Sequence, residues 1–426
     1  MARAYDLIVA GAGIGGLAVG ALLSARGLSV CVLERQSQVG GCVGRVEFSG
    51  FEFEPGMGVY TSLGEGEIWQ RIFAELPVAS PQTSLVARPY VVRTTDGTDV
   101  RLLSGEGFLD ELSGAFPECA DRAIEFYRRS STELLAATSP RFQSFIETQF
   151  RAFGQRSIDS LTRPRGPLYE IHGGPATLAE RFAASIKQSG GTVRLDTAVL
   201  RLAYDSGGEA IGVDLLSGET LTARKAIISN LTIWDTYGKL VGLNRTPSEV
   251  RKQLNTVQGS GAYVVYATIE EPAITRLPGE RLLVATTPAG DDDDAFTEIA
   301  LAIQGRTATL KSATDVTEWF AYHASEEEFE ESDQAALEHF WSKLHAAVPE
   351  LGGDIEIIET SNPRIFYDQT RRKLGMVMGV QSAPMFSART FLPNLFIISD
   401  TVSPSPDLAS VAETALSVAD EITKRP

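Results

Sequence analysis

Residues 5–34 read YDLIVAGAGIGGLAVGALLSARGLSVCVLE, and this stretch decides the fold. Tyr5–Ala10 is a short apolar run typical of a buried strand, and Leu28–Leu33 is a second one. Between them, Leu17–Arg26 consists mainly of small and apolar residues, as in a helix that packs closely on a sheet, and Gly27 ends it. The pattern predicts a strand–helix–strand unit of about 30 residues.

A glycine fingerprint separates the first strand from the helix. Gly11, Gly13 and Gly16 have the spacing G-x-G-x-x-G, which allows a tight turn, a close approach of the backbone to a pyrophosphate, and close packing of helix on strand. Amide groups and the helix dipole then hold the phosphates. Glu34, at the end of the second strand, accepts hydrogen bonds from ribose hydroxyls in such sites. The sequence therefore predicts a dinucleotide site.

Composition and charge exclude several classes of protein. With 426 residues, 43% hydrophobic and 22% charged, the chain is an ordinary globular protein large enough for two domains. Its net charge of -17 repels phosphate backbones, so nucleic acid is not expected as a partner. Against this balance, the basic triplet Arg371-Arg372-Lys373 is typical of a solvated loop or of a contact with a small anion.

Cysteine usage and hydropathy bear on metal binding and location. Cys31, Cys42 and Cys119 have no metal-ligand spacing, so we expect no metal site. The lack of a disulfide pattern and of a leader pattern at the N-terminus favours the cytoplasm. No apolar run approaches the roughly 20 residues that span a bilayer, so no transmembrane segment is expected. Peripheral membrane contact through a loop and a homodimer both stay open.

Hydrophobic periodicity and turn residues outline the remaining elements. We expect helices at residues 107–114, 122–137, 176–189, 325–347 and 408–424. We expect strands at residues 192–195, 199–204, 210–215, 221–229, 261–269, 281–285, 296–302 and 395–399. Pieces of the nucleotide fold alternate with insertions, so the domains are expected to consist of discontinuous segments.

A second glycine turn follows the acid, and an NAD site does not need it. Through Glu34-Arg35 and Gly40-Gly41 the sequence resembles the flavoprotein superfamily of amine oxidases, phytoene desaturases, carotene isomerases and retinol saturase. The stretches GCVGR (41–45), GFEFEPG (50–56), NPRIF (362–366) and PNLFIISD (393–400) are similar to the desaturase and isomerase branch. Most desaturases place arginine directly after the glycine pair, whereas Cys42 is closer to retinol saturase-like members.

The resemblance implies an FAD cofactor and an α/β fold. The fold would have a Rossmann-like FAD-binding domain of the glutathione reductase type, with an inserted α+β substrate domain. The FAD-binding domain is expected at residues 1–75, 165–232 and 362–426, and the substrate-binding domain at 76–164 and 233–361. The cofactor-binding residues expected from these motifs are Gly11, Ala12, Gly13, Ile14, Gly15, Gly16, Glu34, Arg35, Gly40, Gly41, Cys42, Arg45, Val199, Asn230, Asp400, Leu408, Ala409 and Ser410.

Roles within this set also follow from the resemblance. Val199 would contact adenine through its backbone, and Asn230 would end the strand that returns to the cofactor. Asp400 would face the ribityl chain, and the next helix would direct its N-terminus at the flavin pyrimidine, where its dipole stabilises negative charge. Arg45 is either a pyrophosphate contact or a strand-edge arginine.

The chain departs from the family pattern near its end. Members usually have Gly-Asp and then a Pro-Gly-x-Gly turn, whereas this chain has Ser399-Asp400 and then Pro404-Ser-Pro-Asp-Leu408. Asp407 either lies beside the flavin or caps the last helix, and we favour the cap. Cys42 is either a catalytic thiol or a small packing residue, and we favour packing.

Catalytic and substrate residues are less clearly marked. His172 is the candidate base, and a surface histidine is the alternative. Four aromatic residues flank the cofactor segments and would line an apolar substrate cavity or pack the core: Tyr60, Tyr169, Phe366 and Tyr367.

Three hypotheses for function remain. The leading one is FAD-dependent dehydrogenation or saturation of a C–C bond in a small hydrophobic or secondary-metabolite substrate. The second is a redox-neutral cis–trans isomerase that needs reduced flavin. The third is a prenyl or lipid carrier without catalysis, like the Rab GDP-dissociation inhibitors, and the intact Gly11, Glu34 and Asp400 count against it.

Overall fold

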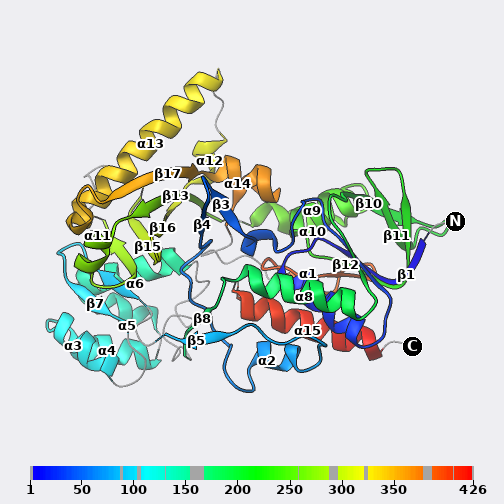
Figure 1. The fold of residues 1–426 in the computed structure, drawn as a ribbon, viewed down its shortest axis with the longest axis horizontal. Helices are drawn as coiled ribbons and strands as arrows, with labels where there is room; N and C mark the ends of the chain where they lie inside the picture. Colours follow the sequence, from blue (N-terminus) through cyan, green and yellow to red (C-terminus); the bar gives the residue numbers. More distant parts are fainter. Residues whose placement is uncertain are drawn as a thin grey trace.

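The computed structural model describes residues 3–86, 90–102, 107–129, 131–153, 167–257, 259–286, 296–320, 325–377, 386–405 and 407–424. Two seven-stranded sheets organise them, each with helices on both faces (Figure 1).

The first sheet contains the predicted strand–helix–strand unit. It consists of β1 (Arg3–Ala10), α1 (Ile14–Ala25) and β2 (Val30–Leu33), and β1 runs parallel to β2. β12 (Thr220–Ser229) lies parallel on the other side of β1, β18 (Leu395–Ile397) is parallel to β12, and β9 (Thr192–Arg194) is parallel to β2. β10 (Val199–Tyr204) and β11 (Ala210–Leu215) extend the sheet antiparallel. Since β1, β2 and β12 end on one side, the loops after them meet there.

Two apolar layers cover this sheet. On one face lie α1, α2 (Ile68–Phe73), α8 (Ala176–Gln188) and α15 (Leu408–Lys424), and Phe182 of α8 stacks on Phe73 of α2 with ring centroids 4.9 Å apart. On the other face lie α9 (Ile233–Asp235), η2 (Thr236–Leu240) and α10 (Ser248–Thr256), which share a core with Ile227 of β12. These elements follow residue 232 in the chain, and the domain boundary expected there stays a prediction.

The second sheet belongs to the inserted part. Its order is β17 (Ile355–Ser361), β13 (Gly261–Ile269), β16 (Thr307–Thr314), β15 (Glu298–Gln304), β14 (Arg281–Ala285), β6 (Val91–Arg93) and β7 (Asp99–Arg101). Neighbouring strands are antiparallel, apart from β14 and β6, which are parallel.

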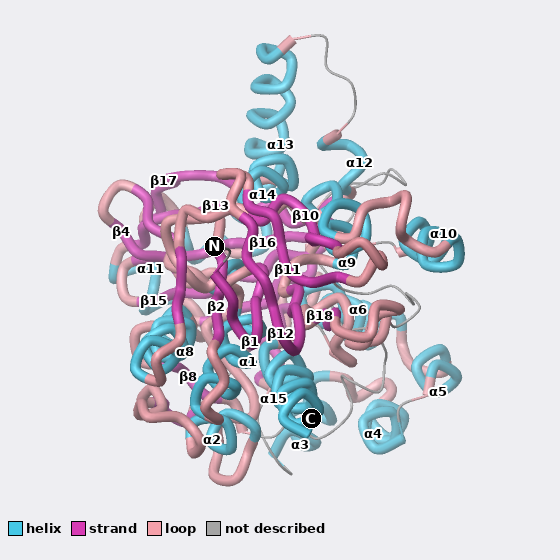
Figure 2. Tube along the Cα trace, turned by 90° about the vertical axis from the view of Figure 1, so that its right-hand side faces the viewer, coloured by secondary structure: helices cyan, strands magenta, loops and turns pink. Residues whose placement is uncertain are grey.

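The two faces of the second sheet have different neighbours. The outer face packs on α11 (Glu271–Arg276), α12 (Val316–Trp319), α13 (Glu326–Ala347) and η3 (Pro349–Leu351). The inner face packs on a helical cluster and on the hairpin of β3 (Val46–Phe48) and β4 (Phe51–Phe53). The cluster consists of α3 (Gly107–Ala115), α4 (Ala120–Arg129), α5 (Thr132–Ala136) and α6 (Pro140–Phe153). In both views α13 projects away from the rest of the molecule (Figures 1 and 2).

Short elements connect the two parts. These are η1 (Gly41–Val43), β5 (Thr83–Leu85), β8 (Tyr169–Ile171), α14 (Pro363–Thr370) and η4 (Lys373–Gly375). Among the described helices, none is long and apolar enough to cross a membrane. The residues that the structure describes contain no group of three or more His, Cys, Asp and Glu side chains that could hold a metal ion.

The predicted α/β fold is confirmed, with two corrections to single elements. The helix expected at 122–137 is two helices, because Ser131 starts a new one by accepting hydrogen bonds from the Glu133 and Leu134 amides. The strand expected at 296–302 begins at Glu298, because Phe296 has a φ of 62°, outside the range of a strand.

Candidate cofactor and active site

The glycine loop has the close contacts that its spacing predicts. Gly11 has a φ of 102°, which disfavours other residues. A side chain at Gly16 would clash with the Gly11 carbonyl oxygen, so α1 starts directly against the loop. Gly13 is the N-cap residue of α1 and has no side chain to cap the helix, while Gly11 and Gly13 keep accessible surface. The first amides of this helix are therefore suited to an anionic group.

The second glycine turn lies on the first. The Gly40 amide, at a φ of 114°, donates to the Ala12 carbonyl at 2.8 Å, and Gly13 and Gly40 form a parallel bridge. A Cβ on Gly41 would lie 3.3 Å from the Gly13 Cα. Gly41 and Cys42 remain exposed beside this contact, so the two turns form one wall.

Glu34 lies where a ribose is expected. Its side chain is buried, and its two carboxylate oxygens accept from the Ala12 amide at 2.8 Å and the Gln36 amide at 2.9 Å. Each oxygen has a second lone pair available for a hydroxyl. The Glu34 carbonyl accepts from the Thr197 amide at 2.7 Å, two residues before Val199 begins β10. The structure thus brings Glu34 and the segment leading to Val199 together.

Asn230 ties the glycine loop to the last strand. Its amide donates to the Ala10 carbonyl at 2.8 Å, and its Nδ2 donates to the Ile398 carbonyl at 2.5 Å. A Cβ at Gly13 would lie only 2.5 Å from the Asn230 Oδ1, so this asparagine requires the glycine. Asp400 follows Ile398 by two residues and therefore lies at the same edge of the sheet.

Asp400 forms an ion pair with Arg372, which the sequence did not single out. The Arg372 Nη1 donates to Oδ1 at 3.2 Å, and Nη2 lies 2.9 Å from Oδ2, in ion-pair contact but outside hydrogen-bond geometry. Nε donates to the Met376 carbonyl at 2.6 Å, and the Arg372 side chain is 8% exposed. Of the two interpretations of the basic triplet, the solvated loop is therefore wrong for this residue. Arg371 has a φ of 58°, and this reversal directs Arg372 inward.

Cys42 lies beside this ion pair. Burial is the main cause that raises the pKa of the thiol, and the Asp400 charge adds to it, while the Arg372 guanidinium opposes both. By accessible surface, however, the Cys42 residue is exposed. A thiol with a raised pKa stays protonated at neutral pH, which favours the packing interpretation of Cys42 over a thiolate nucleophile.

The last helix starts at the predicted cap. The Ser410 amide donates to the Asp407 Oδ1 at 2.8 Å, and the Ser405 amide donates to the Ser410 Oγ at 3.1 Å. This confirms the N-cap interpretation of Asp407. Leu408, Ala409 and Ser410 form the first turn of α15. A Cβ at Gly15 would lie 2.8 Å from a Val411 methyl group, so α1 and α15 start side by side. Residue 406 lies outside the described residues.

The two predicted arginines have protein partners. Arg35 donates to the Gln369 carbonyl of α14. Arg45 binds Glu52 at 2.6 Å and Glu180 at 2.9 Å, and all three side chains are exposed. Two carboxylates therefore already balance the charge of Arg45. Its contact with a pyrophosphate stays a prediction.

The predicted catalytic and substrate residues lie in two separate places. His172 is exposed, its Nε2 lies 3.1 Å from the Ser84 Oγ, and its catalytic role stays a prediction. Tyr60 and Tyr169 pair through their backbones at 2.8 and 2.9 Å. Phe366 and Tyr367 lie on α14 next to η4, and Tyr367 packs on Phe320. Their contact with a substrate also stays a prediction.

A buried polar cluster beside Tyr60 was not expected from the sequence. The Tyr60 hydroxyl donates to the Glu54 carboxylate at 2.5 Å, and burial raises the pKa of both groups. The Arg281 Nε donates to the Met57 carbonyl at 2.8 Å, and its Nη2 binds Glu170. In the sequence, Glu54 of the GFEFEPG motif was the available signal for this cluster. Nothing near Glu54 in the sequence indicates that Arg281 of β14 joins it. The cluster ties the 54–60 segment to the second sheet.

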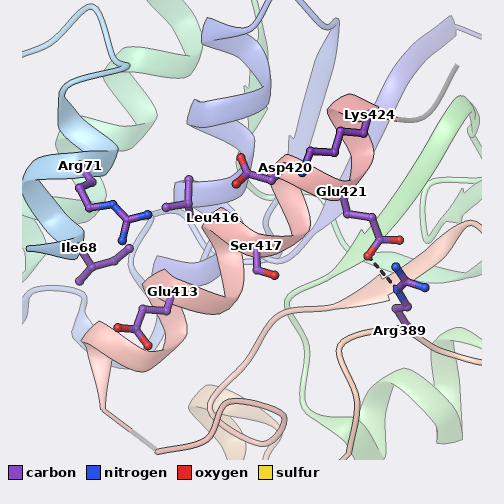
Figure 3. Close-up of a pocket in the computed structure, with 9 residues that line it drawn as sticks. All are labelled: Ile68, Arg71, Arg389, Glu413, Leu416, Ser417, Asp420, Glu421 and Lys424. Carbon is purple, nitrogen blue, oxygen red and sulfur yellow. Dashed lines mark hydrogen bonds and ion pairs between the residues drawn. The ribbon is translucent and has the colours of Figure 1, made fainter.

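A surface groove of about 530 Å³ lies away from these residues, between α2 and α15 (Figure 3). Ile68 and Arg71 line it from α2, and Glu413, Ser417 and Asp420 line it from α15. None of the predicted cofactor residues lines this groove, so it is not the candidate active site.

Curated relatives align with the chain at low identity. It is 23% identical to human all-trans-retinol 13,14-reductase over 459 aligned positions, which covers 84% of this chain and 74% of that enzyme. It is 25% identical to the chloroplastic prolycopene isomerase of Daucus carota, where the alignment covers 58% of this chain and 49% of the isomerase. The chain thus spans about half the length of the second relative.

Solved structures share the fold. An oxidoreductase from Methanosarcina mazei superposes with a TM-score of 0.70 at 17% identity, covering 97% of this chain and 99% of that one. Putrescine oxidase bound to putrescine superposes with a TM-score of 0.63 at 15% identity, covering 99% of each chain.

Family profiles agree with the geometry of the site. A profile of NAD(P)-binding Rossmann-like domains matches residues 9–76, and one of flavin-containing amine oxidoreductases matches residues 110–363. The glycine loop, Glu34, Asn230 and Asp400 fit a flavin dinucleotide, and the predicted FAD cofactor is in accord with this family. Because the second match covers more than half of the sequence, the chain belongs to the family of flavin-containing amine oxidoreductases.

Proposed function

We propose that this protein is an FAD-dependent oxidoreductase that dehydrogenates or saturates a C–C bond in a hydrophobic substrate. One observation carries the proposal: the residues of a dinucleotide cradle come together in a chain that aligns over 84% of its length with a retinol 13,14-reductase. The match with a flavin-containing family supports the redox part. The reductase relative supports the choice of a C–C bond.

The chain's residues divide the work of holding the cofactor. The glycine loop and the start of α1 would hold the pyrophosphate, and Glu34 would hold the ribose. Arg372 keeps Asp400 in place for the ribityl chain, and the start of α15 would face the pyrimidine. When bound, the flavin supplies two-electron hydride chemistry.

The balance of the reaction sets what the protein must add. Saturation places one hydride and one proton across a C=C bond. It therefore needs an external electron donor for the hydride, and the protein or water must deliver the proton. Dehydrogenation removes both and needs an external electron acceptor. The sequence predicts His172 as the residue that exchanges this proton. Because His172 is exposed, water is an equally good source of the proton.

The first experiment identifies the cofactor. The absorbance spectrum of the purified protein is recorded before and after denaturation, and the released compound is identified by mass. We expect one FAD per chain. A protein that contains no flavin and takes up none on incubation with FAD would contradict the proposal and favour the prenyl or lipid carrier.

The second experiment tests the reaction. The reduced protein is incubated with all-trans-retinol without oxygen, and the oxidised protein is incubated with it in air, followed by chromatography and mass analysis. A gain of two hydrogens shows saturation, and a loss of two shows dehydrogenation. An unchanged mass with a new retention time shows isomerisation, the second candidate, which the similarity to prolycopene isomerase favours. An unchanged substrate in both arms would contradict the choice of retinol.

Location and assembly stay proposals. From the sequence we propose a cytoplasmic location. Contact with a membrane surface through a loop and assembly into a homodimer are two further possibilities to test. A sedimentation assay with lipid vesicles and a light-scattering mass measurement test the last two.

A further inference from the structure

The second sheet carries a lysine on its inner face. Lys311 of β16 lies between Val264 of β13 and Ala300 of β15 in register. Its neighbours Ala308 and Leu310 belong to the outer core, under α13. Because successive side chains of a strand alternate between faces, Lys311 points to the inner face, as Thr307 and Thr309 do.

The same face meets the cofactor-binding part of the chain. Tyr266 of β13 packs on Phe48 and Phe53, with ring centroids 5.0 and 5.2 Å apart. The Thr309 hydroxyl donates to the Glu54 carbonyl at 2.8 Å. Lys311 is therefore two residues along β16 from a contact with the 54–60 segment.

The start of β13 is connected to Asp400. Arg372 binds Asp400 and also the Met376 carbonyl, and the next amide, of Val377, donates to the Ser260 carbonyl at 2.9 Å. Val264 lies four residues beyond Ser260, which is roughly 13 Å along a strand. Lys311, opposite Val264, therefore lies toward the end of the sheet that adjoins the predicted flavin site.

Lys311 lacks a direct partner within the part of the chain that the structure describes. No hydrogen bond or ion pair within 4.0 Å connects its ammonium to those residues. Burial lowers its pKa, and the charge of Glu298 opposes this from further away. Lys311 is partly buried, and an ammonium with three donors and no acceptor among the described residues gains from pairing with an anion.

Glu298 is already engaged elsewhere. It is 2% exposed, its Oε1 accepts from the Ala313 amide at 3.0 Å, and its Oε2 lies 3.9 Å from the Arg151 Nη1. Val264, Lys311 and Ala313 keep some accessible surface on the inner face. Lys311 thus has donors unused among the described residues, and accessible surface through which an acceptor could reach it.

We propose that Lys311 binds a carboxylate at the end of an otherwise apolar substrate. This inference rests on the proposed function and names the substrate class of the same site. A carboxylate fits better than a hydroxyl, because it completes the ion pair that Lys311 lacks and forms charge-assisted hydrogen bonds. The charge of Glu298 acts on the ammonium only from further away, and Tyr266 and Val264 offer apolar surface next to it.

The test compares two ligands with one carbon skeleton, retinoic acid and retinol. Binding to the flavin-loaded protein is measured by equilibrium dialysis without turnover. The wild type should bind the acid at least about tenfold more tightly than the alcohol, as expected for a hydrogen bond to a charged group. Lys311→Met should remove this preference and leave retinol binding unchanged, and Lys311→Arg should keep it. Lys252→Met, at an exposed position on α10, is the matched control.

Two outcomes would overturn the inference: equal affinity of the wild type for acid and alcohol, or a preference that Lys311→Met does not change. If Lys311→Met alone does not fold, the double variant Lys311→Met with Glu298→Gln removes both charges and is measured in its place. The dialysis is independent of the reaction. A preference for the acid without conversion of either ligand would contradict the proposed reaction alone, and conversion of retinol without the preference would contradict this inference alone.

Discussion

Arg372 and Asp400 depend on each other because both charges lie inside the protein. Asp400 is a quarter exposed and Arg372 nearly buried, so removal of the cation leaves a carboxylate with little water around it. The loss of one partner from a buried pair typically costs about 3–5 kcal/mol. Among the described residues, Arg371, its neighbour in sequence, forms an ion pair only with the exposed Asp368 and also lies over the Tyr367 ring, so its charge has little effect on stability.

This contrast gives a paired prediction. Arg372→Met should lower the melting temperature by many degrees and reduce the FAD content of the purified protein. Arg371→Met should change the free energy of unfolding by no more than about 0.5 kcal/mol. Differential scanning fluorimetry and the flavin-to-protein absorbance ratio measure both effects. Equal melting temperatures of the two variants would show that the ion pair contributes nothing.

Lys311 predicts a dependence of stability on pH. Burial lowers its pKa in the folded state below the ordinary value of 10.5. Between these two values the unfolded chain binds the proton and the folded chain does not, so stability rises with pH. Without ligand, Lys311→Met should therefore melt at a higher temperature than the wild type at neutral pH. The difference should shrink as the pH approaches 10.5. Melting curves across this range test it, and a constant difference would be the contrary result.

Residues that act through near neighbours could be predicted from the sequence. Gly11, Glu34 and the cap Asp407 each follow from a strand end or a helix start that the local pattern shows. Arg372 could not, because its direction depends on the reversed backbone of Arg371. Lys311 could not either, because the alternation in TATLKSAT (307–314) does not tell whether its polar face meets water or another domain.

At the scale of elements, α1 depends on how closely it starts against its own loop. Gly16→Ala places a methyl group against the Gly11 carbonyl oxygen, and no flexible side chain can move aside there. We expect a lower melting temperature and loss of most bound FAD. Gly114→Ala in α3 is the control, because a Cβ there meets nothing within 4 Å and alanine favours a helix by about 1 kcal/mol. The flavin content of both purified variants is the measurement that tests this prediction. Full FAD occupancy in Gly16→Ala would show that the contact between residue 16 and the Gly11 carbonyl oxygen does not limit cofactor binding.

Elements with a strong apolar pattern have the predicted bounds. β13 at Gly261–Ile269 and β10 at Val199–Tyr204 match the expectation, because each is rich in apolar residues and only Arg201 interrupts β10 with a charge. β16 and β17 were not expected, since threonine, serine and glutamate interrupt their apolar positions. Which face of a strand is buried depends on packing against β3 and β4, which are distant in sequence.

At the scale of the whole molecule, a few polar contacts join the two sheets. The Thr309 hydroxyl binds the Glu54 carbonyl, Arg281 binds the Met57 carbonyl, and Val377 pairs with Ser260. The last contact leads through Arg372 to Asp400, in the predicted flavin site. A cofactor that orders Asp400 should therefore also order the start of β13, because binding stabilises every contact that the bound state requires.

Hydrogen exchange measured by mass spectrometry tests this coupling in the flavin-free and flavin-loaded protein. We expect FAD to slow exchange at residues 11–16, where it is proposed to bind, and also at residues 260–266, at the start of the inserted sheet. Helix α4 at Ala120–Arg129 has no part in the connection and should exchange at the same rate in both states. In Arg372→Met at saturating FAD, the slowing should persist at residues 11–16 and disappear at 260–266. Slowing restricted to the first sheet in the wild type would mean that the two sheets respond to the cofactor independently, and that Arg372 stabilises Asp400 without connecting it to the inserted domain.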